Sequence, residues 1–358
     1  MTQTASAATP ATIPETMRAS VLTDIKTLSI EQVPTPPMAS DEVLVEVAAV
    51  GVCGSDTHYY RHGRIGDFVV TSPLILGHEL SGRIVAVGEE VPETRIGERV
   101  AIEPQKNCRR CRECRAGRYN LCPNMEFYAT PPIDGAFAQY CVIRTEFAHK
   151  IPDSMSDEAA ALLEPLSVAI TTMRKAGVTP GSSILIAGAG PIGILSAQAA
   201  RAFGAAEIIV TDLVLERRER ALRYGATRVL DPRETDIATA GLDVNAFVDA
   251  SGAPPAVMSG IKAVRPGGTA VLVGLGSSEM SLPVEQIQNL EIAVTGIFRY
   301  TDTWPAGIHM VSSGAVELDS LVTGRFGLEH AAEALESDVD PNSLKSVVYP
   351  NGYQQSNS

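Results

Sequence analysis

Short apolar runs separated by glycine and proline dominate the first part of the chain. Runs rich in Val, Ile and Ala occur at 43–50, 82–87 and 136–143. β-branched residues over a few positions, bounded by turn residues, are typical of strands. The pattern predicts an antiparallel β domain whose loops carry reactive side chains.

The pattern changes near Asp157. A helix is predicted over 156–163, with Ser156 or Asp157 as its N-cap. Predicted strands and helices then alternate, which indicates a parallel, doubly wound sheet and an overall α/β fold with a β-rich part. The strands are expected at 184–187, 207–211, 246–249, 270–273 and 292–295, with a first helix at 192–203.

The end of the chain is expected to return to the first domain. A helix is predicted over 304–313 and a strand over 345–349. The division that follows is one domain made of 17–165 and 302–358, and a second made of 166–301. Residues 1–16 are rich in Ala, Thr and Pro, lack the pattern of a secretory signal, and are predicted to be a flexible tail.

The composition limits the classes of protein to which this chain can belong. The chain has 358 residues, 45% hydrophobic and 20% charged, which suits two globular domains. A formal net charge of -13 argues against nucleic acid and against an anionic membrane surface as partners. No apolar run is long enough to span a bilayer. Four of the six cysteines lie within fifteen residues, which without an export signal favours metal over disulfides and predicts a cytoplasmic location.

A glycine turn follows the predicted strand 184–187. Gly188-Ala-Gly-Pro-Ile-Gly193 stands between that strand and a helix, and Asp212 lies 19 positions after the last glycine. This spacing is typical of a dinucleotide site, in which Gly188 permits the turn, Gly190 lets the pyrophosphate approach and Gly193 lets the helix pack closely. The helix N-terminus attracts phosphate. The alternative is a sharp βα turn that connects the strand to the helix and binds no nucleotide.

Asp212 determines which dinucleotide is expected. A carboxylate at the end of the second strand accepts hydrogen bonds from ribose hydroxyls and repels a 2′-phosphate, so NAD is favoured over NADP. Arg217, with Arg218 beside it, is compatible with either cofactor.

The clustered cysteines have the spacing of a metal site. They are Cys108, Cys111, Cys114 and Cys122. Four thiolates close a zinc tetrahedron and leave no position for substrate, so the site is predicted to be structural. Five neighbouring arginines are expected to keep the thiols ionised. A zinc ribbon for nucleic acid, which the acidic charge opposes, and free surface cysteines are the alternatives.

A second set of candidate ligands lies earlier in the chain. Cys53 and His78 are suitable zinc ligands, and Glu79 and Glu164 are candidate carboxylates for an open, catalytic site. Three of these residues also have an interpretation without a metal. Cys53 is then a small buried hydrophobic residue, His78 a hydrogen-bonded loop residue and Glu164 the solvated end of a helix. The residues alone leave these alternatives open.

The segment around His78 resembles the signature of zinc-containing, medium-chain alcohol dehydrogenases. Gly77-His-Glu-x2-Gly82-x5-Gly88-x2-Val91 matches it, and the cysteine cluster, glycine turn and Asp212 follow in the family's order. The resemblance runs from Met17 onward. It implies a GroES-like catalytic domain, a Rossmann domain, one catalytic and one structural zinc, NAD, and a homotetramer.

Further segments are similar to sorbitol, xylitol and arabinitol dehydrogenases: 53–60, 127–132 with 134–135, 163–168, and 296–300 followed by 303–305. The similarity implies zinc ligands Cys53, His78 and Glu79, with Glu164 reaching the metal directly or through water. It implies that the Ser55 hydroxyl contacts the metal-bound oxygen. We expect Ser55 to pass the substrate proton outward by way of water and His58. The similarity assigns the polyol pocket to Tyr59, Phe127, Glu164, Arg299 and Tyr300. It adds Pro191, Ile192, Arg217, Val273, Gly274, Leu275, Phe298 and Arg299 to the cofactor side.

The expected reaction is oxidation of a secondary hydroxyl of a sugar alcohol to a ketose, with hydride transfer to NAD. Ser55 passes the proton outward, and Arg299 bonds a neighbouring hydroxyl, which disfavours simple alcohols. Three alternatives remain: a related zinc dehydrogenase for butanediol or threonine, a quinone-type reductase, which lacks these metal ligands, and a non-enzymatic protein on the same fold.

Overall fold

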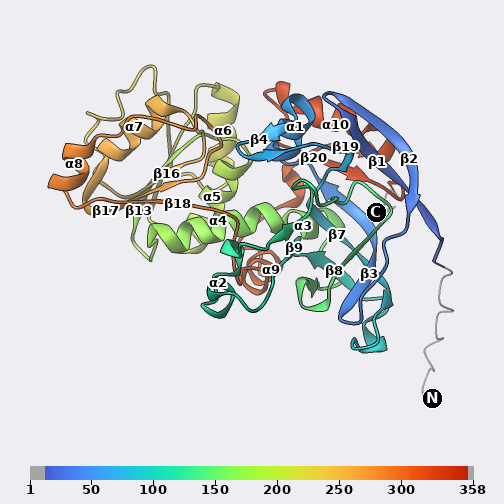
Figure 1. The fold of residues 1–358 in the computed structure, drawn as a ribbon. Coiled ribbons are helices and arrows are strands. Elements are labelled where there is room, and N and C mark those ends of the chain that lie inside the picture. The colour runs from blue at the N-terminus through green and yellow to red at the C-terminus, as the bar shows by residue number, and fades with distance from the viewer. Residues whose placement is uncertain (1–12, 354–358) are drawn as a thin grey trace, which may run out of the picture.

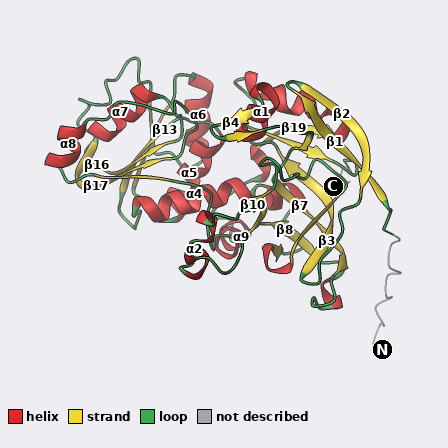
Figure 2. Cartoon of the chain, viewed as in Figure 1, coloured by secondary structure: helices red, strands yellow, loops and turns green. Residues whose placement is uncertain are grey.

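Two lobes lie side by side in the computed structural model, which describes residues 13–353 (Figure 1). One lobe is rich in strands, and the other is a sheet with helices packed on it (Figure 2). Helix α4 (Leu163–Ala176) runs between them and contacts α5 of one lobe and strand β7 of the other.

The β-rich lobe is built on a sheet of seven strands. Its order is β12-β8-β7-β3-β20-β19, with β11 also paired to β3. The strands are β3 (Glu42–Gly51), β7 (Glu79–Val87), β8 (Arg99–Ile102), β11 (Tyr140–Arg144), β12 (Ala148–Lys150), β19 (Val322–Gly327) and β20 (Lys345–Tyr349). The pairs are antiparallel as predicted, except that β19 and β20 are parallel.

Smaller elements complete this lobe. The other strands are β1 (Thr16–Asp24), β2 (Thr27–Pro34) and β6 (Leu74–Ile75) in one sheet, and the ribbons β4 (Arg64–Ile65) with β5 (Phe68–Val69) and β9 (Gln105–Lys106) with β10 (Glu126–Phe127). The helices are α1 (Gly54–His62), α2 (Arg112–Arg115), α3 (Asp157–Ala161), α9 (Trp304–Ser312) and α10 (Ala331–Glu336). Short 3-10 turns are η1 (Glu93–Arg95), η2 (Tyr119–Leu121), η3 (Thr145–Phe147), η4 (Asp319–Leu321), η5 (Leu328–His330) and η6 (Ser337–Val339).

The other lobe is a six-stranded parallel sheet in the order β15-β14-β13-β16-β17-β18. This is the Rossmann order, so the predicted doubly wound sheet is confirmed. Its strands are β13 (Ser183–Ala187), β14 (Glu207–Thr211), β15 (Arg228–Leu230), β16 (Val244–Asp249), β17 (Val264–Leu272) and β18 (Ala293–Gly296). Its other helices are α5 (Pro191–Ala202), α6 (Leu215–Arg223), α7 (Pro254–Lys262) and α8 (Val284–Asn289). No helix within residues 13–353 is long and apolar enough to cross a membrane.

Two predicted elements differ from the structure. The strand expected over 136–143 begins only at Tyr140, because Phe137 bonds instead to Leu76 O through its N–H and to Ser20 N–H through its carbonyl. The helix expected over 156–163 begins as predicted, with Ser156 Oγ accepting from Ala159 N at 2.9 Å, but α3 ends at Ala161.

The first described residues overlap the predicted flexible tail, 1–16. Residues 1–12 lie outside the described residues. Pro14 O accepts a hydrogen bond from the Thr35 hydroxyl, Glu15 O accepts one from Thr35 N, and Thr16 begins β1. The expectation of a flexible tail is therefore wrong for Pro14 to Thr16, because this stretch pairs alongside β2.

One hydrophobic cluster joins the two lobes. It contains Ala49 and Phe127 from the β-rich lobe and Ile194 from the Rossmann lobe, together with Trp304. Trp304 is fully buried, its ring stacks on His149 at 5.5 Å between centroids, and it meets Tyr300 edge-on at 5.0 Å. The junction between the lobes is therefore a packed core.

Replacing Trp304 with alanine is expected to lower the free energy of unfolding by about 3–5 kcal/mol, because the lost ring leaves a cavity in this core. Thermal unfolding followed by circular dichroism measures the effect as a lower Tm. Trp304→Phe, which keeps an aromatic ring, should lose less. An unchanged Tm in the alanine variant would contradict a shared core.

Candidate active site and metal centres

A cavity of about 500 Å³ opens between the lobes. Its β-rich side includes the predicted metal and substrate residues, and its Rossmann side includes the glycine turn. The predicted site residues that line it are Cys53, Ser55, His58, Tyr59, His78, Glu79, Phe127, Glu164, Gly190, Pro191, Ile192, Arg217, Val273, Gly274, Leu275, Phe298, Arg299 and Tyr300. The structure thus brings together residues separated by more than two hundred positions.

Three candidate metal donors meet in this cavity. The ligand atoms of Cys53, His78 and Glu79 all lie within 4.8 Å of one another. Cys53 caps α1, while His78 and Glu79 enter β7 from a turn at Gly77, whose φ is 90°. A Cβ at Gly77 would come within 2.6 Å of the Phe137 ring, so the turn requires glycine. A sulfur, a nitrogen and an oxygen donor fit a zinc site with room for a further ligand.

Asp56 joins the two segments that carry these donors, and the sequence analysis missed it. Its carboxylate accepts from Gly77 N at 2.9 Å and from Cys53 N at 3.1 Å, and it lies 3.4 Å from His78 Nδ1. Burial acts to raise the pKa of Asp56, but His78 and the two backbone N–H groups outweigh it and lower the pKa. Asp56 therefore stays ionised and orients His78. Its position at N3 of α1, three residues after the cap, is a spacing that could have identified it.

Lys345 is a second residue that the sequence did not reveal. Its Nζ donates to Glu79 Oε1 at 2.6 Å and to Val52 O at 2.8 Å, and its side chain is buried. Burial acts to lower the pKa of Lys345, but Glu79 outweighs it and the pKa is raised. Lys345 thus balances the charge of a buried carboxylate that is 266 positions away in the chain.

Glu164 is 5% exposed, which excludes the solvated helix end considered for it. Tyr300 donates its hydroxyl proton to Glu164 Oε1 at 2.6 Å. Burial raises the pKa of Glu164 to about 7, and the nearby charge of Glu79 acts in the same direction. Glu164 is not part of the three-donor group, so its direct contact with a metal stays a prediction.

Arg299 lies between two aromatic rings. Its Cζ is 3.8 Å from the ring centroid of Phe127 and 4.7 Å from that of Phe298. One terminal nitrogen lies 3.5 Å from Thr130 Oγ1. Burial lowers the pKa of Arg299 to about 10, so the group remains a cation at neutral pH. A guanidinium held this way presents hydrogen-bond donors to a polar ligand.

The glycine turn fits a dinucleotide. Gly188 has a φ of 97°, and a Cβ at Gly193 would lie 1.9 Å from Gly188 O. A Cβ at Gly190 would meet nothing within 4 Å among the described residues, so the backbone there is open to a phosphate. Asp212 accepts from Ala189 N at 2.8 Å, which places its carboxylate beside the turn.

The two arginines after Asp212 have different surroundings. Arg218 donates to Asp212 O at 2.7 Å and pairs with Asp231 at 3.0 Å, so it belongs to the lobe's structure. Arg217 lines the cavity.

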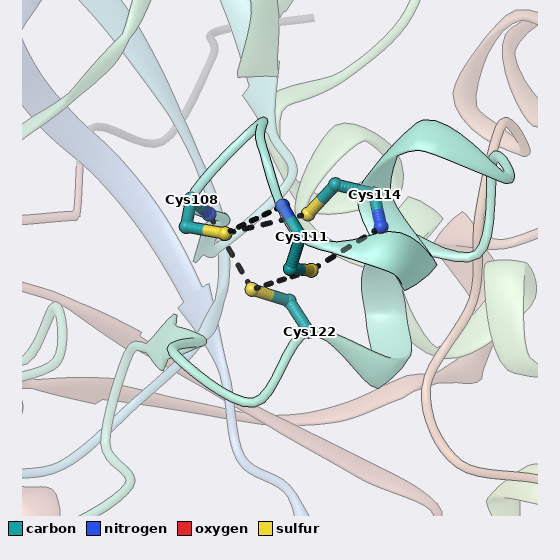
Figure 3. Close-up of side chains that lie close together, drawn as sticks. All are labelled: Cys108, Cys111, Cys114 and Cys122. Atoms are coloured by element: carbon teal, nitrogen blue, oxygen red, sulfur yellow. Dashed lines mark hydrogen bonds between the residues drawn. The ribbon is translucent and has the colours of Figure 1, made fainter.

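The four clustered cysteines form a separate centre (Figure 3). Their sulfurs turn toward one another, and the Cys108–Cys114 and Cys111–Cys122 sulfur pairs are each 3.9 Å apart. A zinc tetrahedron with four sulfurs has edges of about 3.8 Å, so the set fits a closed zinc site. The backbone N–H groups of Arg110 and Cys111 lower the pKa of Cys108 to about 6.

Some of the five neighbouring arginines pair with carboxylates of the described residues. Arg109 pairs with Asp41 and Glu146, and Arg118 pairs with Glu113. Backbone N–H groups contact the cysteine sulfurs. The expected effect of the arginines on the thiols stays a prediction.

Comparison with known proteins agrees with this geometry. Residues 39–153 match the alcohol dehydrogenase GroES-like domain, and residues 191–313 match the zinc-binding dehydrogenase family. The chain is 47% identical to the sorbitol dehydrogenase of Bacillus subtilis (strain 168), covering 95% of this chain and 99% of the relative. It is 40% identical to D-xylulose reductase A of Aspergillus oryzae, covering 92% and 95%. The crystal structure of 2R,3R-butanediol dehydrogenase from Bacillus subtilis is 31% identical, with a TM-score of 0.86 and coverage of 94% and 100%.

These matches extend over nearly the full length of the chain and of its relatives. The non-enzymatic and quinone-reductase alternatives are not supported, because the donors Cys53, His78 and Glu79 lie together and the relatives are zinc-family enzymes. The chain belongs to the zinc-binding, medium-chain alcohol dehydrogenase family, in the group that includes sorbitol dehydrogenases and D-xylulose reductases.

Proposed function

We propose that the protein is an NAD-dependent zinc enzyme that oxidises a secondary hydroxyl of a sugar alcohol, of the sorbitol, xylitol or arabinitol type, to a ketose. The observation that carries the proposal is the single cavity into which Cys53, His78, Glu79 and Arg299 open together with the glycine turn at Gly190. The identity with a sorbitol dehydrogenase over nearly the full length supports the substrate class.

Cys53, His78 and Glu79 would hold the catalytic zinc, with Glu164 close by. When bound, zinc supplies Lewis acidity that lowers the pKa of an alcohol hydroxyl and favours loss of its proton. Ser55, which lines the cavity, accepts that proton on its Oγ while it releases its own hydroxyl proton outward, by way of water and His58 at the exposed rim.

The residues that recognise the polyol are Arg299, Tyr59, Phe127 and the Tyr300–Glu164 pair. Arg299 hydrogen-bonds a hydroxyl next to the reacting carbon, while its aromatic neighbours fix the guanidinium. A simple alcohol leaves these half-buried donors unpaired, which disfavours it.

The residues of the Rossmann lobe would hold the nucleotide. Asp212, beside the glycine turn, would bind the ribose hydroxyls, and Gly190 would face the pyrophosphate. The other proposed cofactor contacts are Gly188, Pro191, Ile192, Gly193, Arg217, Val273, Gly274, Leu275, Phe298 and Arg299. When bound, the nicotinamide would supply the hydride acceptor, and these residues would orient it toward the substrate.

A related zinc dehydrogenase for butanediol or threonine is the second candidate. Its support is the likeness to 2R,3R-butanediol dehydrogenase, at 31% identity. The identity with sorbitol dehydrogenase is 47%, and the cationic Arg299 suits several hydroxyls, so the polyol is favoured.

The proposal also covers the domain organisation, the structural zinc ligands, the oligomeric state and the location of the enzyme. We assign 17–165 with 302–358 to the catalytic domain and 166–301 to the NAD domain; the pairing of β20 with β3 supports the return of the chain. We further propose Cys108, Cys111, Cys114 and Cys122 as the structural zinc ligands, a homotetramer, and a cytoplasmic enzyme without nucleic-acid or membrane partners.

The first test is NADH formation with xylitol, sorbitol, arabinitol, galactitol, 2,3-butanediol and threonine, each with NAD and with NADP, before and after chelator treatment. The expected result is NAD-dependent, chelator-sensitive turnover of a polyol. Preference for butanediol or threonine would overturn the substrate class and retain the zinc mechanism.

Cys53→Ser is expected to lower kcat by about a thousandfold or more, because the Lewis acid accounts for several kcal/mol of the barrier. Metal analysis should show one zinc per chain in place of two, with little change in Tm. Cys111→Ser is the matched contrast: it should also lose one zinc but lower Tm, because a structural zinc contributes folding free energy. Full turnover by Cys53→Ser would refute the catalytic site.

Asp212→Ser is expected to shift the ratio of kcat/KM for NAD over NADP by about tenfold to a hundredfold toward NADP. Removal of the carboxylate ends its repulsion of the 2′-phosphate, an effect of a few kcal/mol. Glu216→Gln, which changes an exposed acid of α6, serves as the control and should leave the ratio unchanged. An unaltered ratio in the Asp212 variant would exclude its role in choosing the nucleotide.

A further inference from the structure

The segment 108–124, which carries the four clustered cysteines and is called the four-cysteine lobe below, contacts the loop 297–303 through its turn η2. This loop carries two proposed substrate residues, Arg299 and Tyr300. Asn120 Nδ2 donates to Phe298 O at 2.7 Å. The backbone N–H of Asp302 donates to Tyr119 Oη at 2.8 Å. The two bonds therefore hold the loop on either side of its pocket side chains.

This loop has a backbone that needs external support. Arg299 has a φ of 57° and Asp302 a φ of 50°. Residues with a Cβ rarely adopt this left-handed conformation, because the side chain crowds the backbone. The neighbouring hydrogen bonds offset that cost and fix the direction in which Arg299 leaves the loop.

A buried carboxylate orients Tyr119 for this contact. Tyr119 donates its hydroxyl proton to Glu103 Oε1 at 2.8 Å, which leaves its oxygen free to accept from Asp302. Burial and the charge of Glu103 raise the pKa of Tyr119, so the hydroxyl keeps its proton. Glu103 also lies 3.0 Å from His149 Nε2, whose ring stacks on Trp304 just beyond the loop.

The metal centre fixes η2 from its other end. Cys122 follows η2 directly, and its N–H donates to Tyr119 O at 3.0 Å. The Cys122 sulfur lies 3.9 Å from that of Cys111 within the four-cysteine group. A displacement of this sulfur would therefore move Tyr119 and Asn120 relative to the loop.

We propose that the four-cysteine lobe has a second role: through Tyr119 and Asn120 it positions Arg299 and Tyr300 for recognition of the substrate's additional hydroxyl groups. Tyr119 and Asn120 are positioning residues, since they act through the loop. The substrate part of this proposal rests on the proposed polyol activity.

Helix α4 contacts the same loop from another side. Arg174 donates to Asp302 O at 3.0 Å, and Lys175 donates at 2.7 Å to the carbonyl of Gly296, the residue just before the loop. Loss of the lobe's contacts therefore loosens the loop without releasing it, so substrate binding should weaken while the metal donors stay in place.

Tyr119→Phe and Asn120→Ala, singly and combined, test the proposal in the zinc-loaded full chain. Each single change is expected to raise KM for the preferred polyol by about threefold to tenfold, the effect of one lost hydrogen bond, with kcat within about twofold. Hydrogen exchange measured by mass spectrometry should become faster in 297–303. Zinc content should stay at two per chain.

Two controls isolate the effect. Asn124→Ala removes an exposed amide of the same lobe and should leave both readouts unchanged. In an Arg299→Met background, Asn120→Ala should add little to KM, because the residue through which it acts is already gone.

Unchanged exchange and KM in the double variant would overturn the proposal. So would a parallel loss of kcat, zinc and Tm, because that outcome assigns the lobe a structural role alone. If the unaltered protein oxidises no polyol, the proposed function fails, but the exchange measurement still decides whether the lobe holds the loop.

Discussion

The arrangement of the site depends on charge that is buried at the junction of the two lobes. Four carboxylates there, Asp56, Glu79, Glu103 and Glu164, are at most 5% exposed. A buried carboxylate without a partner is unfavourable by several kcal/mol, so each must find a donor or cation. Backbone N–H groups, Lys345, Tyr119 and Tyr300 supply them. Because these partners come from distant parts of the chain, satisfying the charges also fixes how the segments meet.

Much of the fold and site could be predicted because the signals are local. Three motifs each occupy a short stretch of sequence: the glycine turn, the cysteine cluster and the pair at 78 and 79. The turns at Gly77 and Gly188 have positive φ angles, which residues other than glycine rarely adopt. At Gly193 the constraint is steric, since any side chain there would collide with Gly188 O. The alternation of strands and helices likewise determined the parallel sheet.

The features that escaped prediction depend on contacts between distant segments. Lys345 opens a strand that the sequence predicts over 345–349 without indicating a partner for the lysine, and only the fold brings it to Glu79. The strand predicted to begin at 136 is shortened because Phe137 bonds to two separate segments. Asp56 differs from these, because its spacing from Cys53 is a local capping pattern and could have been recognised.

The two metal centres differ in charge as well as in geometry, and this difference explains where each lies. A thiolate and a carboxylate with a neutral imidazole balance a zinc ion, so the set at Cys53, His78 and Glu79 can be enclosed between the lobes. Four thiolates leave two negative charges, which are costly to bury. Three of those four cysteines are partly exposed, and backbone N–H groups contact their sulfurs. The closed centre therefore belongs near the surface, where water and backbone dipoles stabilise its charge, and the hydrogen bonds of η2 connect it to the loop that borders the cavity.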